Sequence, residues 1–369
     1  MTESIHFAGR RSYDHVRWFI MPDSYSALLI VESELHGVRI DSFLIKHFRN
    51  YTSWRMQRIV AAGHVTINDE LASPTQRVFV GNQVKVGLIE PPDKLLEAET
   101  VTFRILYRDQ WMLVVDKPAG VISHPSGDYQ TGTLANGVQA YLDTLTPRRG
   151  LVRPGIVHRL DRQTSGLMVV ATHHRSHAEL SDAFEAGRVS KEYLAIVEGR
   201  MLNDEGMIDL PIGRSRTGSR VLMSARGDAV DARVAKTKYN VEQRFAEHTL
   251  VRAKPMTGRN HQIRVHFAQI GHPLVGDEFY DIKGSYKTQG DEFGSADTQS
   301  ESLHFLAQGR HALHATSLAF AHPITGIWLS FSSPLPTDMR RLADTMKVER
   351  SPNLIPITNE APYPDDVKT

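Results

Sequence analysis

The sequence predicts a globular protein in which helices and strands are both well represented. Short apolar runs that end at Pro or Gly are typical of buried strands, and Met112–Val115, shortly before Pro118, is one of them. Apolar residues at helical spacing between Ile40 and Phe48 predict an amphipathic helix. The 369 residues are 41% hydrophobic and 23% charged, which is ordinary for a globular protein with a substantial core.

The overall composition excludes several classes of protein. The chain contains no cysteine, so disulfides and thiolate metal sites are excluded. No apolar run approaches the roughly 18 residues of a membrane span, and the N-terminus lacks the basic-then-apolar order of a secretory signal. We therefore expect a cytoplasmic protein with no membrane partner. The formal net charge of +1 gives no overall signal for nucleic-acid binding, so only local patches could provide one.

Changes in composition divide the chain into five segments. We interpret them as a lead-in segment at 1–37, a small basic module at 38–90, a linker at 91–100, a larger domain at 101–348 with a polar inserted loop at about 283–302, and an extended tail at 349–369.

The small module combines two predicted helices with strands. The second helix begins near Ser53 and ends before Gly63. A strand follows at Val65–Ile67, and alternating valines predict a hairpin around Gly81–Asn82. From residue 36 to 86 the chain carries seven Lys and Arg residues against three Asp and Glu residues. This excess would attract a phosphate backbone, although a solvated helix surface explains it equally well.

The most distinctive stretch is Ile156–Gly166, in which Asp161 lies between two arginines. Taken alone, an Asp–Arg pair beside a glycine turn is most often a solvated surface feature. The stretch nevertheless closely resembles the signature of the pseudouridine synthases of the large-ribosomal-subunit (RluA/RluD) type. In that family the aspartate of His-Arg-Leu-Asp is catalytic, which implies this role for Asp161.

Further motifs occur in the family's order, so the resemblance extends over about residues 38 to 345. Lys117–Pro125 is similar to the first motif, and the predicted strand Lys191–Gly199 carries a Lys-x-Tyr element whose tyrosine is Tyr193. Thr257–His266 is similar almost letter for letter to Thr-Gly-Arg-x-His-Gln-[Ile/Leu]-Arg-x-His. The later arginine of that motif pairs with the catalytic aspartate in the family, which implies this role for Arg264.

The resemblance also implies the fold. It predicts an α+β catalytic domain with a mostly antiparallel mixed sheet and a central cleft. The order of features in the small module is similar to the RNA-binding module named after ribosomal protein S4. Asn68–Asp69 stands where that module often has Asn-Gly, and both pairs suit a turn.

The implied reaction is isomerisation of uridine to pseudouridine in RNA. It involves neither a redox change nor net hydrolysis, so we expect no cofactor and no metal. An ionised carboxylate could act as the nucleophile or as the base that takes the 2′ proton of the sugar, and the sequence does not choose between these routes. Ribosomal RNA is the first expectation for the substrate and tRNA the second. A catalytically inactive RNA-binding assembly factor is the alternative, and we expect a monomer.

Neighbouring side chains receive roles from the same resemblance. Arg159 is the candidate to fill the space left by a flipped base, with a phosphate contact as its competing role, while Leu160 and Leu167 would wall the pocket. The phenol ring of Tyr193 would give the flipped base a flat surface for stacking, although a strand tyrosine is ordinarily a packing residue. The side chains expected to bind RNA are Arg39, Arg55, Arg58 and Lys117, the last of which is equally plausible as an ordinary surface residue.

Three histidines, His173, His174 and His177, lie close together and suggest a metal site. No carboxylate–histidine pair at helical ligand spacing accompanies them, so the sequence disfavours a metallohydrolase. Ser176 and Glu179 instead predict a capping box that opens a helix.

Overall fold

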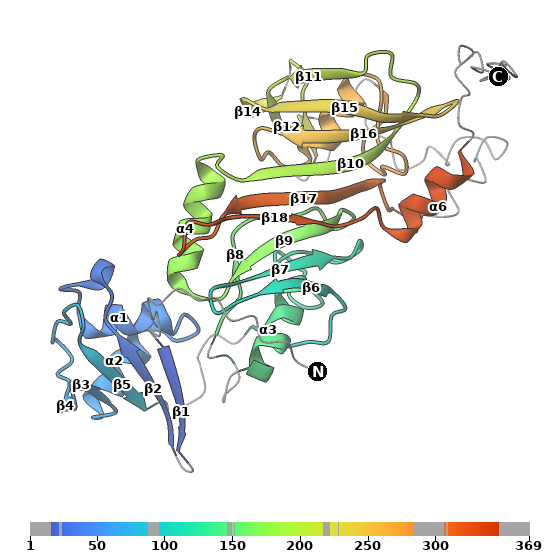
Figure 1. Cartoon of the computed structure of the whole chain (residues 1–369). Coiled ribbons are helices and arrows are strands. Elements are labelled where there is room, and N and C mark those ends of the chain that lie inside the picture. Colours follow the sequence, from blue (N-terminus) through green and yellow to red (C-terminus); the bar gives the residue numbers. More distant parts are fainter. Residues whose placement is uncertain are drawn as a thin grey trace, which may run out of the picture.

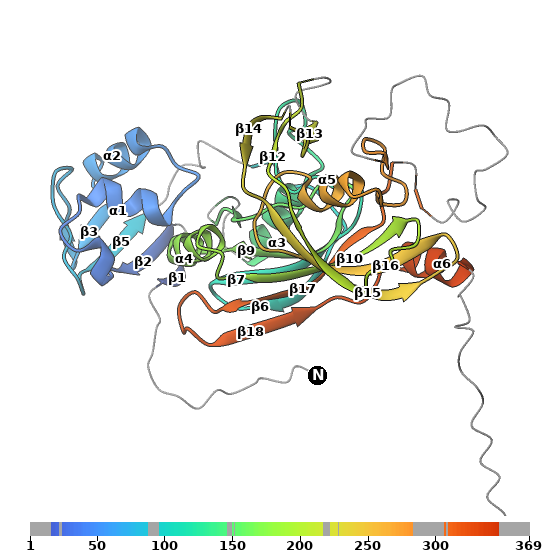
Figure 2. The ribbon, with the colours of Figure 1, turned by 90° about the horizontal axis from the view of Figure 1, so that it is seen from above.

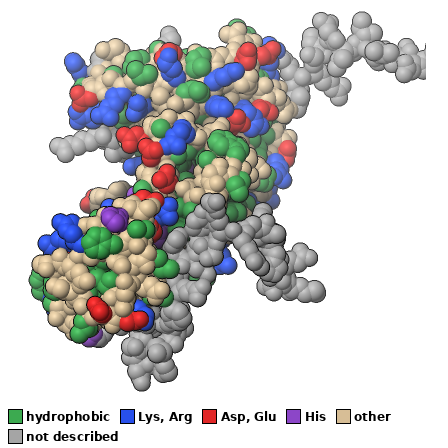
Figure 3. All heavy atoms as spheres, turned by 60° about the vertical axis from the view of Figure 1, so that its left-hand side comes forward, with side chains coloured by type: hydrophobic (Ala, Val, Ile, Leu, Met, Phe, Trp, Pro, Cys, Tyr) green, Lys and Arg blue, Asp and Glu red, His purple; other side chains and the backbone are tan. Residues whose placement is uncertain are grey.

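The computed structural model describes residues 16–21, 24–87, 96–145, 150, 152–216, 222–227, 229–282, 306–307 and 309–346. The inserted loop expected at 283–302, the tail at 349–369 and the first half of the linker lie outside the described residues. The chain forms an N-terminal module, residues 16–87, and a larger domain, residues 96–346, which appear as separate lobes in Figures 1 and 3. Within the described part of the chain, no helix is both long and apolar enough to cross a membrane.

The N-terminal module is a five-stranded antiparallel sheet with two helices. Its sheet has the order β1-β2-β5-β3-β4. The elements are β1 (Val16–Met21), β2 (Ser24–Ile30), the 3-10 helix η1 (Ser33–Leu35), α1 (Ile40–His47), α2 (Ser53–Ala61), β3 (Val65–Ile67), β4 (Glu70–Leu71) and β5 (Gln83–Gly87). Because β1 and β2 belong to this sheet, the module begins within the segment that we interpreted as a lead-in.

The local predictions for the module are largely confirmed. The apolar stripe of α1 is fully buried, and α2 is capped by Thr52, whose Oγ1 accepts a hydrogen bond from the backbone N–H of Arg55 at 3.3 Å. Asn68 and Asp69 both have positive φ angles, which suits the tight turn between β3 and β4. The prediction of a hairpin around Gly81–Asn82 is wrong, because β5 pairs with β2 and β3 instead of with residues 78–80.

The larger domain is built on one ten-stranded mixed sheet. The strands are β6 (Arg104–Arg108), β7 (Met112–Lys117), β8 (Gly155–Ile156), β9 (Ser165–Ala171), β10 (Ser190–Glu198), β11 (Glu205–Asp209), β15 (Lys236–Arg244), β16 (His248–Pro255), β17 (Leu313–Ala321) and β18 (Trp328–Ser332). The main path runs β11-β15-β16-β10-β17-β9-β7-β6, with β18 on β17 and β8 on β9. All pairs are antiparallel except β17 with β9, which confirms the expected α+β class with a mostly antiparallel mixed sheet.

Helices and a small second sheet lie on and beside the large sheet (Figure 2). The helices are α3 (Leu134–Leu145), α4 (His174–Glu185), α5 (Gln262–Gln269) and α6 (Thr337–Thr345). The small sheet consists of β12 (Ile212–Arg214), β13 (Met223–Ser224) and β14 (Val230–Arg233). Hydrophobic clusters pack on both faces of the large sheet, so its central strands are buried on both sides.

The parallel contact between β9 and β17 explains one glycine of the signature stretch. Gly166 has a φ of +115°, and a Cβ built there would overlap the backbone of Ala315. Gly166 therefore allows β17 to approach β9 closely. The turn that we assigned to it lies earlier, where the N–H of Thr164 donates to the carbonyl of Asp161 at 3.0 Å.

Candidate active site

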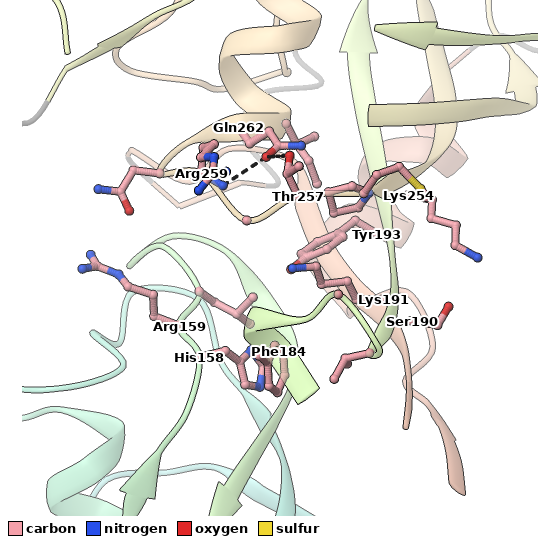
Figure 4. Close-up of a pocket in the computed structure, with 18 of the residues that line it drawn as sticks. His158, Arg159, Phe184, Ser190, Lys191, Tyr193, Lys254, Thr257, Arg259 and Gln262 are labelled. Carbon is pink, nitrogen blue, oxygen red and sulfur yellow. Dashed lines mark hydrogen bonds between the residues drawn. The ribbon is translucent and has the colours of Figure 1, made fainter. Parts of the chain in front are cut away.

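A cleft of about 770 Å³ lies between the loop that follows β8, the start of β10, and the segment between β16 and α5. Figure 4 shows Arg159 on one side of this cleft, Thr257, Arg259 and Gln262 on the other, and Tyr193 between them. The residues that line it include Leu160, Asp161, Tyr193 and Arg264, which are far apart in the sequence. The structure thus brings the expected aspartate, tyrosine and arginine to one cavity.

Lys117 holds the loop that carries Asp161 in place. Its side chain is buried, and its ammonium donates to the carbonyls of Pro118 and Val121, both at 2.8 Å, and of Arg162 at 3.2 Å. Burial lowers the pKa of Lys117 to about 7. Lys117 is therefore neither an RNA contact nor a surface residue, and both sequence interpretations of it are wrong. Its ammonium satisfies three backbone carbonyls in two turns and so stabilises the conformation of the loop.

Arg264 joins two carboxylates. Its Nε and Nη2 donate to Asp277 Oδ2 and Oδ1 at 2.7 and 2.8 Å, and its Nη1 donates to Asp161 Oδ2 at 3.2 Å. Asp277 also accepts hydrogen bonds from the backbone N–H groups of Phe279 and Tyr280. The planar guanidinium is thus held by a buried bidentate pair, and one N–H of its Nη1 is directed at Asp161.

His261 approaches the same aspartate from the N-terminus of α5. It caps this helix in a left-handed conformation with φ 54°, and its Nε2 lies 3.9 Å from Asp161 Oδ2. Its Nδ1 is hydrogen-bonded to the hydroxyl of Tyr280 at 2.7 Å. The helix begins one residue later, at Gln262, and this turn aims the imidazole into the cleft.

The electrostatic environment keeps Asp161 ionised. Burial by itself would raise its pKa, but the charges of His261 and Arg264 and the hydrogen bond from Arg264 outweigh burial and hold the pKa below the usual value. Burial also lowers the pKa of His261, whereas the guanidinium of Arg264 is permanently charged.

Tyr193, Leu160 and Leu167 have different surroundings. Tyr193 lies on β10 and lines the cleft beside Lys191, with its pKa raised by burial and by the negative charge of Asp161 (Figure 4). Leu160 also lines the cleft. Leu167 does not wall the pocket, which corrects our expectation. It points from β9 to the side covered by α4 and is 1% exposed in the core.

The cleft has a strongly positive lining. Its bases are Arg159, Arg188, Lys191, Lys254, Arg259 and Arg264, and its acids are Asp161 and Glu185. This local excess is concealed in the nearly balanced charge of the whole chain. It is the charge distribution that an anionic polymer requires.

The three arginines expected to bind RNA lie on the N-terminal module and do not line the cleft. Arg39 precedes α1, is 45% exposed and is paired with Asp41 at 3.0 Å. Arg58 is exposed on α2, where its guanidinium lies 4.8 Å from the centre of the Trp54 ring. Arg55 is half-buried on the same helix.

Sequence reasoning missed Asp277 and most of the basic lining of the cleft. Asp277 ends the segment Gly271–Asp277, for which the sequence predicted no role in the site. A buried aspartate that follows a glycine turn gives no sign of its partner, since Arg264 precedes it by a helix and a loop. Lys191 and Arg259 belong to recognised motifs, but their place in the cleft depends on how the strands pair.

Comparison with known proteins identifies the family. A family model described as RNA pseudouridylate synthase matches residues 111–269. A Bacillus subtilis protein named Uncharacterized RNA pseudouridine synthase YlyB is 37% identical over 319 residues, 86% of this chain and 97% of its own length. A Pseudomonas aeruginosa protein named Ribosomal large subunit pseudouridine synthase D is 35% identical over 333 residues, 89% of this chain and 98% of its own length.

A solved structure agrees with these relatives. The structure of Human RNA Pseudouridylate Synthase Domain Containing 1 is similar with a TM-score of 0.50 and 25% identity, covering 75% of this chain and 100% of that chain. The motifs, the sheet topology and these similarities all agree. The chain therefore belongs to the RluA family of RNA pseudouridine synthases, which are isomerases.

Proposed function

We propose that this enzyme isomerises specific uridines in ribosomal RNA and that Asp161 is its catalytic carboxylate. The observation that supports the proposal is that Asp161, Tyr193 and Arg264 line one cleft although they lie on three separate segments. Asp161 is partly accessible there, with 22% of its side chain exposed, whereas Arg264 behind it is 4% exposed. A carboxylate that is oriented by a buried guanidinium and exposed to the cleft is suited to react with a bound nucleotide.

The chemistry required of Asp161 is limited. The bond between the sugar C1′ and the ring N1 breaks, the uracil turns within the cleft, and its C5 bonds to the same sugar carbon. The C5 proton is released and N1 is protonated, so the reaction is balanced without an added reagent. Asp161 supplies negative charge, either as a nucleophile or as the base for the 2′ proton.

The other side chains of the cleft bind the nucleotide. Tyr193 provides the flat surface against which the extruded uracil stacks. Arg159 lies at the opposite wall, where it fills the space vacated in the RNA or contacts a phosphate (Figure 4). Leu160 closes the apolar side, and the surrounding lysines and arginines hold the RNA backbone.

Ribosomal RNA is favoured as the substrate by two observations. The Pseudomonas aeruginosa relative is named for the large ribosomal subunit, and the N-terminal module offers Arg39, Arg55 and Arg58 for phosphate contacts. We further propose that the enzyme acts as a monomer in the cytoplasm, where bacterial ribosomes are assembled. A tRNA substrate is the competing assignment.

The catalytic role of Asp161 is tested with Asp161→Asn, which preserves shape and removes charge. Because the C5 hydrogen is released during isomerisation, loss of tritium from RNA labelled at C5 measures turnover. We expect the variant to bind the RNA and to release no tritium above background. Turnover near wild type would refute the role of Asp161. A folded wild-type protein without activity on any RNA would support the inactive assembly factor.

The choice of RNA is tested by mapping pseudouridines in cells with and without the gene. We expect sites to disappear from ribosomal RNA and to return with the wild-type gene but not with Asp161→Asn. Loss confined to tRNA would refute the ribosomal assignment while leaving the enzyme assignment intact.

A further inference from the structure

A cluster of metal-ligating side chains lies between the N-terminal module and the larger domain, away from the catalytic cleft. Glu32 follows β2, His47 ends α1, and His173 and His174 stand at the start of α4. One ligand atom from each of these four side chains lies within 4.8 Å of the others. Figures 1 and 2 both place α1 beside α4, so the cluster lies at the contact between the N-terminal module and the larger domain.

Several polar atoms of the cluster are buried without a hydrogen bond. The side chain of Glu32 is 2% exposed, and its two carboxylate oxygens contact only histidine Nε2 atoms of the cluster, at 3.5 and 3.7 Å, with no hydrogen bond to any other described residue. Nε2 of His47 and Nε2 of His173 likewise make no hydrogen bond to any other described residue. A buried carboxylate is unfavourable unless it is hydrogen-bonded or bound to a cation. Packing alone therefore does not account for this arrangement.

The ligand atoms are close enough together to be drawn onto one metal ion. Nε2 of His47 is 3.5 Å from one oxygen of Glu32, and Nε2 of His174 is 3.7 Å from the other. Ligand atoms around a tetrahedral Zn²⁺ are about 3.4 Å apart, given bonds of about 2.1 Å. Small side-chain rotations would bring these atoms to bonding distance. Three imidazoles and one carboxylate form a donor set suited to Zn²⁺.

We propose that Glu32, His47, His173 and His174 bind one Zn²⁺ ion that fastens the N-terminal module to the larger domain. The same interface carries a hydrogen bond from Asn50 to the carbonyl of Gly150 at 2.7 Å. The ion is structural and fixes the module in position relative to the cleft. The proposal is independent of the substrate and of the role of Asp161.

His173 differs from the other ligands in one respect. Its Nδ1 accepts the capping hydrogen bond of α4 from the N–H of Arg175 at 3.3 Å. A metal at Nε2 requires the ring proton on Nδ1, so this long contact opens when the ion binds. We therefore expect His173→Ala to lose less zinc affinity than His47→Ala or His174→Ala.

The sequence did not predict this site, because its carboxylate and its third histidine come from the N-terminal module. His173 and His174 are adjacent in the sequence, but Glu32 and His47 lie more than 120 residues before them, at no spacing that a local motif would show. The expected capping box is also wrong. The helix begins at His174 with His173 as its cap, and Ser176 donates to the carbonyl of Trp111 at 2.6 Å.

The direct test is a metal titration of the full chain after removal of any affinity tag and dialysis against a chelator. Zn²⁺ is added in the presence of a chromophoric competitor, and Co²⁺ is added separately to record visible absorption. We expect one equivalent of Zn²⁺ to bind, and Co²⁺ to give the intense bands of tetrahedral coordination. Glu32→Gln, which keeps the size of the side chain, should weaken Zn²⁺ binding by about tenfold or more.

His248→Ala is the matched control, because Nε2 of His248 lies 3.1 Å from a carboxylate oxygen of Glu198 outside the cluster. This variant should bind Zn²⁺ as wild type does. Thermal unfolding supplies a second readout, since an ion that binds only the folded state must raise the melting temperature. We expect that rise in wild type and His248→Ala and its loss in Glu32→Gln.

Three results would overturn the proposal. They are wild-type protein that takes up no Zn²⁺ against the competitor, equal affinity in wild type and Glu32→Gln, and octahedral Co²⁺ spectra alone. Should Glu32→Gln fail to fold, the wild-type Co²⁺ spectrum and the comparison of His174→Ala with His248→Ala decide the question.

Discussion

Replacing Arg264 with lysine is the most informative perturbation of the cleft. Arg264 makes three charge-assisted hydrogen bonds, two to Asp277 and one to Asp161. The lysine side chain is shorter, and its ammonium cannot reproduce the planar arrangement of N–H donors in the guanidinium. The variant therefore retains at most one of these bonds at full strength. The variant keeps the positive charge, so it separates the geometry of the guanidinium from its charge.

The expected loss of stability follows from the burial of the pair. Each charge-assisted hydrogen bond contributes about 1.5–3 kcal/mol to the free energy of unfolding, so losing two costs about 3 kcal/mol or more. The side chains are 4% and 0% exposed, which places the pair among those whose disruption costs about 3–5 kcal/mol. Denaturation in urea measures this difference.

The expected loss of activity follows from the contact with Asp161. A misplaced donor leaves the carboxylate poorly oriented, and loss of one positioned donor in an active site typically lowers kcat by about 10²–10³. Tritium release from labelled RNA, under conditions in which the variant is folded, measures kcat/KM. A folded Arg264→Lys enzyme with wild-type kcat/KM would refute the positioning role of the guanidinium.

Arg252→Lys is the matched control for both measurements. Arg252 also pairs with two carboxylates, Glu242 at 2.6 Å and Glu192 at 3.4 Å, but its side chain is 35% exposed. Exposed ion pairs contribute about 0–1 kcal/mol, so the control should change stability by no more than that. Its activity should remain that of wild type.

Three further predictions concern the support of the site and the module. Gly166→Ala should lower the free energy of unfolding by about 1–3 kcal/mol, because its φ is +115° and the new methyl group overlaps Ala315; an unchanged urea midpoint would contradict this. Burial opposes ionisation of Asp277, but Arg264 outweighs it and lowers the pKa from 3.8 to about 2. The resulting stability, about 2 kcal/mol, is fully present above about pH 4 and lost as pH falls through about 2, so the pH dependence of unfolding should be flatter in Asp277→Asn. The double charge reversal Arg55→Glu and Arg58→Glu should weaken RNA binding and reduce its salt dependence, while tritium release at saturating RNA stays unchanged; an unaltered affinity would argue against the module as an RNA contact.

Individual elements could be predicted from local patterns in the sequence, whereas the fold class was implied by the family resemblance. The stripe of α1 and the apolar run of β7 both follow from the pattern of hydrophobic residues. Pairing between distant strands is not encoded locally. The partners of β5 and the assignment of β1 and β2 to the module's sheet therefore appeared only in the structure.

The site could be predicted in part, because a resemblance transfers residues but not their surroundings. Asp161, Tyr193 and Arg264 were named in advance and meet at one cleft. Lys117 was misjudged because a lysine beside a Pro–Gly turn is usually exposed, whereas here three carbonyls satisfy its ammonium. Burial of a charged side chain depends on acceptors supplied by other segments, and the local sequence does not contain them.

In the proposed mechanism, the distribution of charge allows Asp161 to be both fixed and reactive. Asp277 cancels the charge of Arg264 inside the core, so the three side chains together carry a single negative charge. Arg264 and His261 both approach Asp161 at Oδ2, so neither of them occupies Oδ1. If Arg264 were paired with Asp161 alone, its positive charge would neutralise the carboxylate that it orients. By sharing the guanidinium with a stronger, bidentate partner, the fold orients Asp161 and preserves its charge for the sugar or the base.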